Sequence, residues 1–302
     1  MSEYIAYLNG EWVSLGNVNI DVATDRGFYV GDSVFDVART FNGESFRMKE
    51  HVDRLYRSLS HVRIDPGISS EEMQDVSEQA IQRNEHLRPE IGDYTVHQFV
   101  TRGHGRRAWQ AVNPTVCVRV APVDFANFAH LYEGGMHASV TNSRSYDPSS
   151  LDPKVKHYSR LNFNLAELEA NDIDPGALPI LLDHAGNVTE GTGYNVFIVT
   201  NGILRTPGDR SILQGVSRGM VFDLARQLNI PFVEEDLQPY DVYTADEAFF
   251  CTTSWSIMPV TYVDRRPIGN AKPGPLTTQL ISAWSESVGV DIVGQAVRFA
   301  TK

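Results

Sequence analysis

The chain has 302 residues, of which 42% are hydrophobic, enough for one large domain or two small ones with a packed core. Its formal net charge of −12 argues against a surface for nucleic acid or for anionic membranes, although local charge can still bind small anions. The amino terminus lacks the basic and apolar regions of a signal peptide, and no apolar run approaches the roughly 20 residues of a membrane helix. We therefore expect a cytoplasmic protein with no nucleic-acid or membrane partner. Cys117 and Cys251 lie in apolar runs and are expected to be buried free thiols.

The first 120 residues alternate strand and helix signals. Asn9-Gly10 is a strong hairpin turn, and Asn42-Gly43 turns back a strand in which apolar and polar residues largely alternate. Ser69 opens a helix with Glu72 as its capping-box partner. The predicted elements are strands over residues 4–8, 11–13, 33–40, 94–101 and 115–120, and helices over 50–62 and from Ser69 onward.

The rest of the chain is richer in strands. Pro122, an irregular aromatic stretch and Gly134-Gly135 indicate a linker. The expected division is an N-terminal α/β domain over 1–121, a linker over 122–135 and a C-terminal domain over 136–302. The predicted elements are strands over 178–183, 196–200, 203–205, 248–252 and 258–263, and helices over 217–228 and 275–288.

The most informative stretch begins at Glu190 and ends at Arg218. A small-residue turn follows the carboxylate, then an apolar strand that starts near Asn195, then Thr206-Pro207 and a Gly-Val-Ser-Arg loop. This order resembles the signature of class IV pyridoxal-phosphate enzymes, and its span makes it far more specific than a short motif. The resemblance covers most of the chain. It implies a mixed α/β, fold type IV enzyme with a smaller N-terminal domain, a larger strand-rich C-terminal domain, bound pyridoxal 5′-phosphate (PLP) and a homodimer.

Lys156 is the candidate catalytic residue, since PLP enzymes need an amine that forms a Schiff base with the cofactor and later moves a proton. It lies 34 residues before Glu190, which matches the family spacing better than the 36 residues of Lys154. Glu190 is expected to face the pyridine nitrogen and keep it protonated. The alternative interpretations are that Lys154 and Lys156 are ordinary surface charges and that Glu190 is an exposed residue of a turn.

Three segments are candidates for the phosphate, and no metal site is expected. Arg54 lies in a His-x-x-Arg-Leu string whose arginine binds phosphate in the family; its alternative role is a surface salt bridge with Glu50. Ser217 marks a predicted helix start, where it could serve as the N-cap or bind an anion. The expected cofactor ligands are Arg54, Lys156, Glu190, Val216, Ser217, Thr252 and Thr253. One departure is Leu161, where several relatives have a tyrosine for the ring hydroxyl; Tyr158 or Arg160 could replace it.

Shorter sequence motifs indicate the class of substrate. Thr101-Arg102-Gly103 and Arg107 resemble part of the carboxylate clamp of D-amino-acid transaminases, although Trp109 replaces the expected histidine. The alternative for Arg107 is a solvated loop charge. Phe35 and Val37 share one strand face and, with Trp255, are candidates for the pocket wall, core packing being the alternative for the first two.

Other strings favour other members of the family. The Leu-Gln-Gly-Val-Ser-Arg loop and the Cys-Thr-Thr loop resemble (R)-amine transaminases, whereas Lys156-His-x-x-Arg160-Leu161 resembles the lyases. The chain lacks the Tyr-x-Arg-Pro strand of branched-chain enzymes. We expect a PLP-dependent transaminase that uses a D-amino acid or (R)-amine as donor and a 2-oxo acid such as pyruvate or 2-oxoglutarate as acceptor. The alternatives are a permissive L-branched-chain enzyme, an aminodeoxychorismate-lyase-like enzyme and a non-catalytic descendant.

Overall fold

The computed structural model describes residues 4–300, which divide into two compact units. The first unit extends to Val123 and includes Val155–Ser159, and the second contains Asp124–Lys154 and the residues from Arg160 onward. The sequence placed residues 155–159 in the C-terminal domain and 122–135 in a linker. The stretch from Asp124 instead packs in the second unit, because Phe125, Phe128 and Tyr132 are buried there.

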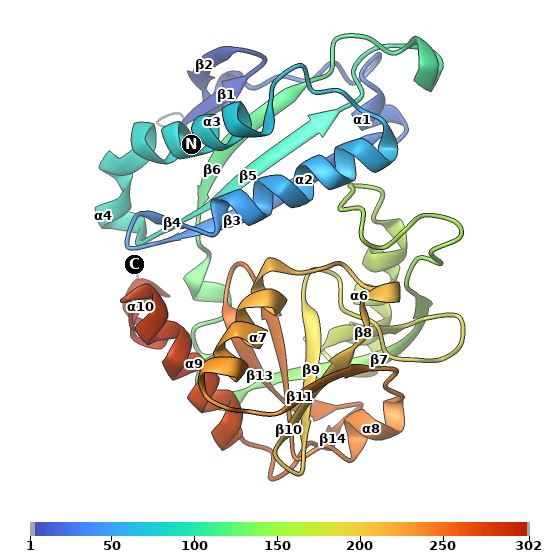
Figure 1. Cartoon of the computed structure of the whole chain (residues 1–302), viewed down its shortest axis with the longest axis vertical. Coiled ribbons are helices and arrows are strands. Elements are labelled where there is room, and N and C mark those ends of the chain that lie inside the picture. Colours follow the sequence, from blue (N-terminus) through green and yellow to red (C-terminus); the bar gives the residue numbers. More distant parts are fainter. Residues whose placement is uncertain (1–3, 301–302) are drawn as a thin grey trace. The chain divides into compact units, whose positions relative to one another are not determined.

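The first unit is built on an antiparallel sheet with strand order β2-β1-β6-β5-β3-β4 (Figure 1). The Asn9-Gly10 hairpin is confirmed, with both residues at positive φ as a tight primed turn requires. The Ser69 capping box is also confirmed. The elements of this unit are β1 (Ile5–Leu8), β2 (Glu11–Ser14), η1 (Leu15–Asn17), α1 (Arg26–Tyr29), β3 (Ser33–Phe41), β4 (Glu44–Phe46), α2 (Met48–Val62), α3 (Ser70–Asn84), η2 (Glu85–Leu87), α4 (Arg88–Ile91), β5 (Tyr94–Thr101), η3 (Ala108–Gln110) and β6 (Val116–Pro122).

Helices α2 and α3 cover one face of this sheet and form the core of the unit (Figure 1). Because side chains alternate between the two faces of a strand, only every second residue of β3, β5 and β6 enters that core. The core-facing strand residues are Val34, Ala38, Tyr94, Val96, Val100, Val116, Val118 and Val120. The alternate positions, Phe35 and Val37 of β3 included, point to the opposite face.

The second unit contains a mixed sheet with strand order β11-β10-β9-β12-β13-β7-β8, and β14 pairs with β13. Helix α6 packs on β7 and β8, while α7 packs on β12 and α9 on β13 (Figure 1). The elements are η4 (Phe125–Asn127), α5 (Leu131–Gly134), β7 (Met136–Arg144), α6 (Leu161–Ile173), β8 (Leu178–Leu182), β9 (Asn195–Thr200), β10 (Ile203–Pro207), η5 (Asp209–Ser211), α7 (Val216–Gln227), β11 (Phe232–Glu235), α8 (Pro239–Tyr243), β12 (Glu247–Thr252), β13 (Ser256–Val263), β14 (Arg266–Pro267), α9 (Pro275–Val288) and α10 (Ile292–Ala300).

Both cysteines are buried free thiols, as expected, and burial raises the pKa of Cys117 to about 11 and that of Cys251 to about 12. Between residues 4 and 300, no helix combines the length and the apolar character needed to cross a lipid bilayer.

Candidate active site

Arg54 lies in a buried ion-pair cluster between α2 and β3. Its Nε donates to Asp36 Oδ2 at 2.8 Å and its Nη2 donates to Asp36 Oδ1 at 2.8 Å. His51 Nδ1 lies 2.7 Å from the same Oδ1. The surface salt bridge to Glu50 was therefore a wrong alternative, because Glu50 pairs with Arg47 and Arg54 is only 5% exposed. Asp36 was not singled out in the sequence, although its strand position next to Phe35 offered a signal.

Asp36 is ionised in this cluster. Burial alone would raise the pKa of its carboxyl group, but the charge of Arg54 and the hydrogen bond from His51 outweigh burial and hold that pKa well below its ordinary value. Burial lowers the pKa of His51, and the nearby charges of Arg54 and Lys156 lower it further, against the opposing effect of Asp36. The cluster is thus an ionised carboxylate with a fixed guanidinium and a neutral imidazole.

Lys156 joins the same corner of the first unit through its backbone. The Phe35 N–H donates to the Lys156 carbonyl at 3.0 Å, and the Lys156 N–H donates to Ser58 Oγ at 3.1 Å. Ser58 Oγ in turn donates to the Arg54 carbonyl at 3.2 Å, which links the two candidate cofactor residues. The Lys156 ammonium lies 4.7 Å from the centre of the Phe35 ring. Lys154 belongs to the second unit and pairs with Asp152.

Glu190 is held by a backbone amide and a side-chain amide of the second unit. The Leu213 N–H donates to Glu190 Oε1 at 3.0 Å, and Asn195 Nδ2 donates to Oε2 at 3.2 Å and to the Leu213 carbonyl at 3.1 Å. Glu190 is 7% exposed, so the exposed-turn alternative was wrong. The structure explains why an asparagine follows five residues later: it orients the carboxylate.

Helix α7 begins beside this carboxylate. Its N-cap is Gly215, no side chain caps it, and Val216 and Ser217 are its first two residues. The alternative that Ser217 is the N-cap was therefore wrong. A Cβ atom on Gly215 would lie 2.1 Å from Asn195 Oδ1, so the glycine leaves room for the amide that orients Glu190. The first turn, which no side chain caps, has backbone N–H groups of the kind that bind anions.

The turn between β12 and β13 carries the other predicted residues of this unit. Thr252 Oγ1 donates to the Gly193 carbonyl at 2.6 Å, which ties the turn to the loop after Glu190. The Trp255 ring packs between those of Phe128 and Tyr194. Tyr132 donates to the Trp255 carbonyl at 2.6 Å, so a residue of the expected linker supports this turn.

Tyr158 and Arg160, the two candidates to replace the missing tyrosine at Leu161, belong to different units. Leu161 is 79% exposed. Tyr158 stacks on Phe35 with ring centres 3.9 Å apart in the first unit. Arg160 belongs to the second unit and donates to the Thr192 carbonyl, two residues after Glu190.

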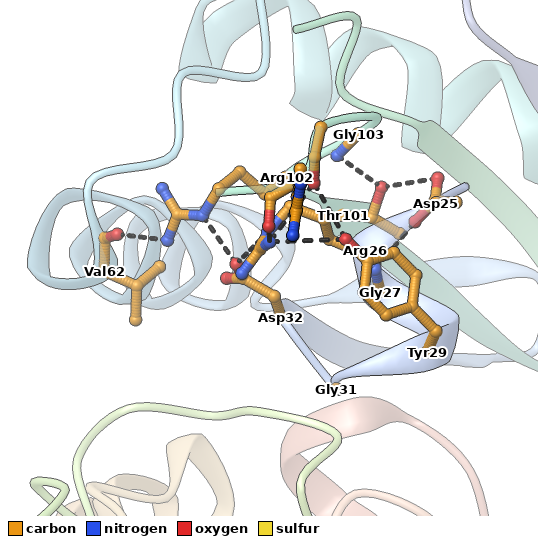
Figure 2. A network of polar contacts seen from close by, with 12 residues as sticks. Asp25, Arg26, Gly27, Tyr29, Gly31, Asp32, Val62, Thr101, Arg102 and Gly103 are labelled. Atoms are coloured by element: carbon orange, nitrogen blue, oxygen red, sulfur yellow. Dashed lines mark hydrogen bonds and ion pairs between the residues drawn. The ribbon is translucent and has the colours of Figure 1, made fainter. Parts of the chain in front are cut away.

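Arg107 lies on a loop whose backbone is held by partly buried charged side chains around Asp32. Figure 2 shows Arg26 and Arg102 beside Asp32. Asp32 accepts hydrogen bonds from Arg26 Nε at 2.9 Å and Arg102 Nε at 2.8 Å. Arg26 Nη1 donates to the Gly105 carbonyl at 3.2 Å and to the Arg106 carbonyl at 3.3 Å, while the Tyr29 hydroxyl donates to the Gly105 carbonyl at 2.8 Å. The side chain of Arg107 is exposed and lies 5.8 Å from the centre of the exposed Trp109 ring. The loop is ordered while its basic side chain faces solvent.

Comparison with known proteins decides the family. The sequence model described as "Amino-transferase class IV" matches residues 33–263, which is most of the chain. The chain belongs to the class IV aminotransferases. It is 37% identical over 91% of its length to a Methanocaldococcus jannaschii protein with the provisional name of branched-chain-amino-acid aminotransferase, and covers 93% of that protein. It is 30% identical over 93% of its length to the D-alanine aminotransferase of Listeria monocytogenes, and covers 95% of that enzyme.

Solved structures of the family agree with the fold. The branched-chain aminotransferase of Escherichia coli superposes with a TM-score of 0.88 at 26% identity, over 94% of each chain. The T.th. branched-chain enzyme in complex with N-(5′-phosphopyridoxyl)-L-glutamate superposes with a TM-score of 0.87 at 24% identity, over 100% of this chain and 98% of that one. The mixed α/β fold type IV architecture expected from the sequence is therefore confirmed.

This aminotransferase uses PLP, and the residues present fit that cofactor chemically. Lys156 would supply an amine for the aldehyde, and Glu190, which is buried, would supply a carboxylate for a protonated ring nitrogen. Arg54 of the first unit and the uncapped first turn of α7 in the second unit are each of the kind that would bind phosphate.

Proposed function

We propose that this aminotransferase moves an amino group from a D-amino acid or an (R)-amine to a 2-oxo acid such as pyruvate or 2-oxoglutarate. The observation that carries the proposal is the ordered loop that follows Thr101 and Arg102 and presents Arg107. An exposed guanidinium on a fixed backbone suits the carboxylate that amino acids and 2-oxo acids share. The relatives named D-alanine aminotransferase support the same donor class.

Lys156 is proposed as the catalytic residue. Bound PLP supplies an aldehyde that captures the donor amine and a ring that takes up the electrons left when the Cα–H bond breaks. The Lys156 amine accepts the proton from the donor Cα and returns it at the cofactor's C4′ atom. Its backbone hydrogen bonds to Phe35 and Ser58 fix the position from which the side chain extends.

The other polar residues bind and orient. Glu190 holds a proton on the ring nitrogen, and Asn195 and the Leu213 N–H keep both carboxylate oxygens in place. Arg54 and the N–H groups of Val216 and Ser217 would bind the phosphate, with the hydroxyl of Thr253 as a further donor. The Thr252 hydroxyl donates to the Gly193 carbonyl and would hold the turn in place beside the cofactor. Phe35 and Val37 of the first unit, and Trp255 of the second, are the apolar residues proposed to contact the donor side chain.

Two other activities have support of their own. The Methanocaldococcus jannaschii relative, which shares 37% identity, favours a permissive L-branched-chain-amino-acid aminotransferase. The Lys156-His-x-x-Arg160-Leu161 string favours an aminodeoxychorismate-lyase-like reaction. For each activity we propose a homodimer, which light scattering on the purified protein tests directly.

The deciding experiment is a donor panel with the holoenzyme. L- and D-alanine, L- and D-leucine and both enantiomers of an aryl amine are each assayed with pyruvate and with 2-oxoglutarate. We expect the D and (R) donors to exceed their enantiomers in kcat/KM. A preference for L-leucine establishes the branched-chain activity instead, and pyruvate release from aminodeoxychorismate without an acceptor establishes the lyase.

A further inference from the structure

The face of the first unit's sheet opposite α2 and α3 is mostly apolar and carries two arginines, Arg39 of β3 and Arg119 of β6. Arg39 is buried, donates to the Thr40 carbonyl and lies 4.0 Å from the centre of the Phe41 ring. Val116, Val118 and Val120 of β6 enter the core under the helices, so the residues between them face the other way. Arg119 is therefore on the face that carries Phe35 and Val37. It is half-buried there.

The side chain of Arg119 makes no hydrogen bond or ion pair with any residue between 4 and 300. Its partner across the strands is His97 of β5. The side chains beside it on this face offer no carboxylate; they belong to Thr95, His97, Phe99, Cys117 and Ala121. Half-buried guanidinium groups usually have a counterion, because desolvating a charge without one is costly.

His97, the cross-strand neighbour of Arg119, carries no charge of its own at ordinary pH. Burial lowers the pKa of His97 to about 3, and the nearby positive charges of Arg119 and Lys156 contribute to that shift. The imidazole is neutral at ordinary pH, and its Nε2 lies 3.0 Å from Thr95 Oγ1. Arg119 therefore presents a fixed positive charge to this part of the face, suited to one anionic group.

We propose that Arg119 binds the second carboxylate of a dicarboxylic 2-oxo acid or amino acid, so that the 2-oxoglutarate and glutamate class is preferred over pyruvate and alanine. This inference rests on the proposed function, in which Lys156 supplies the reactive amine. Arg107 would serve the carboxylate that every acceptor has, whereas Arg119 recognises the one that only dicarboxylic acids carry. A planar guanidinium binds such a group through two parallel hydrogen bonds.

The register places Arg119 at a suitable separation from Lys156. The Lys156 ammonium lies over Phe35 of β3, Val37 of the same strand pairs with His97, and His97 pairs with Arg119. Because neighbouring strands lie about 4.8 Å apart, β6 is roughly 10 Å from β3. A five-carbon dicarboxylic acid together with the long arginine side chain spans this separation, whereas the three-carbon pyruvate has no second carboxylate to bridge it.

The test compares acceptors in Arg119→Met holoenzyme. We expect kcat/KM for 2-oxoglutarate to fall roughly ten- to a hundredfold, the usual effect of losing one charge-assisted contact. The value for pyruvate should stay within about threefold of the parent. Arg57→Met removes an exposed arginine from α2 of the same unit and serves as the matched control. Equal losses for both acceptors, or no loss for either, overturn the proposal.

A binding measurement separates this proposal from the donor assignment. Calorimetry on the parent holoenzyme should show tighter binding of glutarate than of propionate, and Arg119→Met should remove that difference. If glutarate and propionate bind the parent equally, the Arg119 site is wrong whatever the donor. If L donors have the higher kcat/KM while glutarate still binds more tightly than propionate, the proposed donor class is wrong and the Arg119 site is supported. Should Arg119→Met fail to fold, Arg119→Lys keeps the charge without the paired hydrogen bonds and should weaken 2-oxoglutarate selectively.

Discussion

Arg54 turns one edge of its guanidinium to Asp36, with Nε and Nη2 each 2.8 Å from a different carboxylate oxygen. Both side chains are buried, and His51 lies against the same carboxylate. The orientation of Arg54 is therefore set by the protein before any phosphate arrives, which reduces the ordering cost of binding.

Asp36→Asn should destabilise the apoenzyme by about 3–5 kcal/mol at neutral pH, since it leaves a buried guanidinium without its counterion. The pKa of Asp36 lies below its ordinary value of 3.8 in the folded protein, so its contribution to stability is complete above that value and is lost as the pH falls below it. Denaturant unfolding should thus show a difference between parent and variant that shrinks in acid. A difference that stays constant from pH 7 to pH 2 would contradict the assignment.

Arg54→Ala should weaken PLP binding by roughly one to two powers of ten, because it removes a charge-assisted contact worth about 1.5–3 kcal/mol. Cofactor titration of the folded apoenzyme measures the dissociation constant. Arg57→Ala, on the exposed side of the same helix, is the control and should bind PLP normally. An unchanged dissociation constant in Arg54→Ala would remove this residue from the phosphate site.

Lys156→Ala should lose the yellow absorbance of the lysine-bound cofactor and all measurable turnover while keeping its circular dichroism spectrum. The amine it removes is the group that bonds the cofactor and moves the proton. Lys154→Ala is the matched control, since that side chain pairs with Asp152 instead. Borohydride reduction followed by peptide mapping should find the label at residue 156, and a label at 154 would reverse the assignment.

Glu190→Gln should keep the cofactor but lose on the order of 10²–10³ in kcat, because a neutral amide cannot hold a proton on the ring nitrogen. Asn195→Ala leaves the carboxylate and removes one hydrogen bond to it, a loss of about 0.5–1.5 kcal/mol, so kcat should fall only a few- to tenfold. Rapid-mixing kinetics of the first half-reaction measure both. Equal rates in Glu190→Gln and the parent would exclude Glu190 from the mechanism.

Arg107→Ala should slow half-reactions of amino acids and 2-oxo acids several-fold or more, because the lost contact to their carboxylate is charge-assisted. An amine without a carboxylate should react with the PLP form as fast as in the parent. Stopped-flow absorbance measures both donors in single half-reactions. If every amino acid reacts at the parental rate, Arg107 is a solvated loop charge and the carboxylate must bind elsewhere, first at the turn from Thr252 to Ser256.

Several elements could be predicted from the sequence because their causes are local. The Asn9-Gly10 turn, the Ser69 cap, the strand over 94–101 and the helix over 275–288 each depend on residues within a few positions of one another. Helix α6 was not predicted, because Leu161, Leu165 and Leu168 are exposed and its buried positions are Phe163, Ala166 and Ala170. The pattern of this segment alone does not show which of its residues are buried, because burial depends on what packs against the helix.

The sequence by itself determined the family and the linear order of its chemical groups, since the span from Glu190 to Arg218 and the spacing back to Lys156 are properties of one chain. Tertiary structure decided the partners. It paired Arg54 with Asp36 instead of Glu50, placed Asn195 between Glu190 and Leu213, and joined residues 155–159 to the first unit. Which charged groups and amides interact depends on the distances between them in the folded protein. Those distances are set by the packing of elements that are far apart in the sequence.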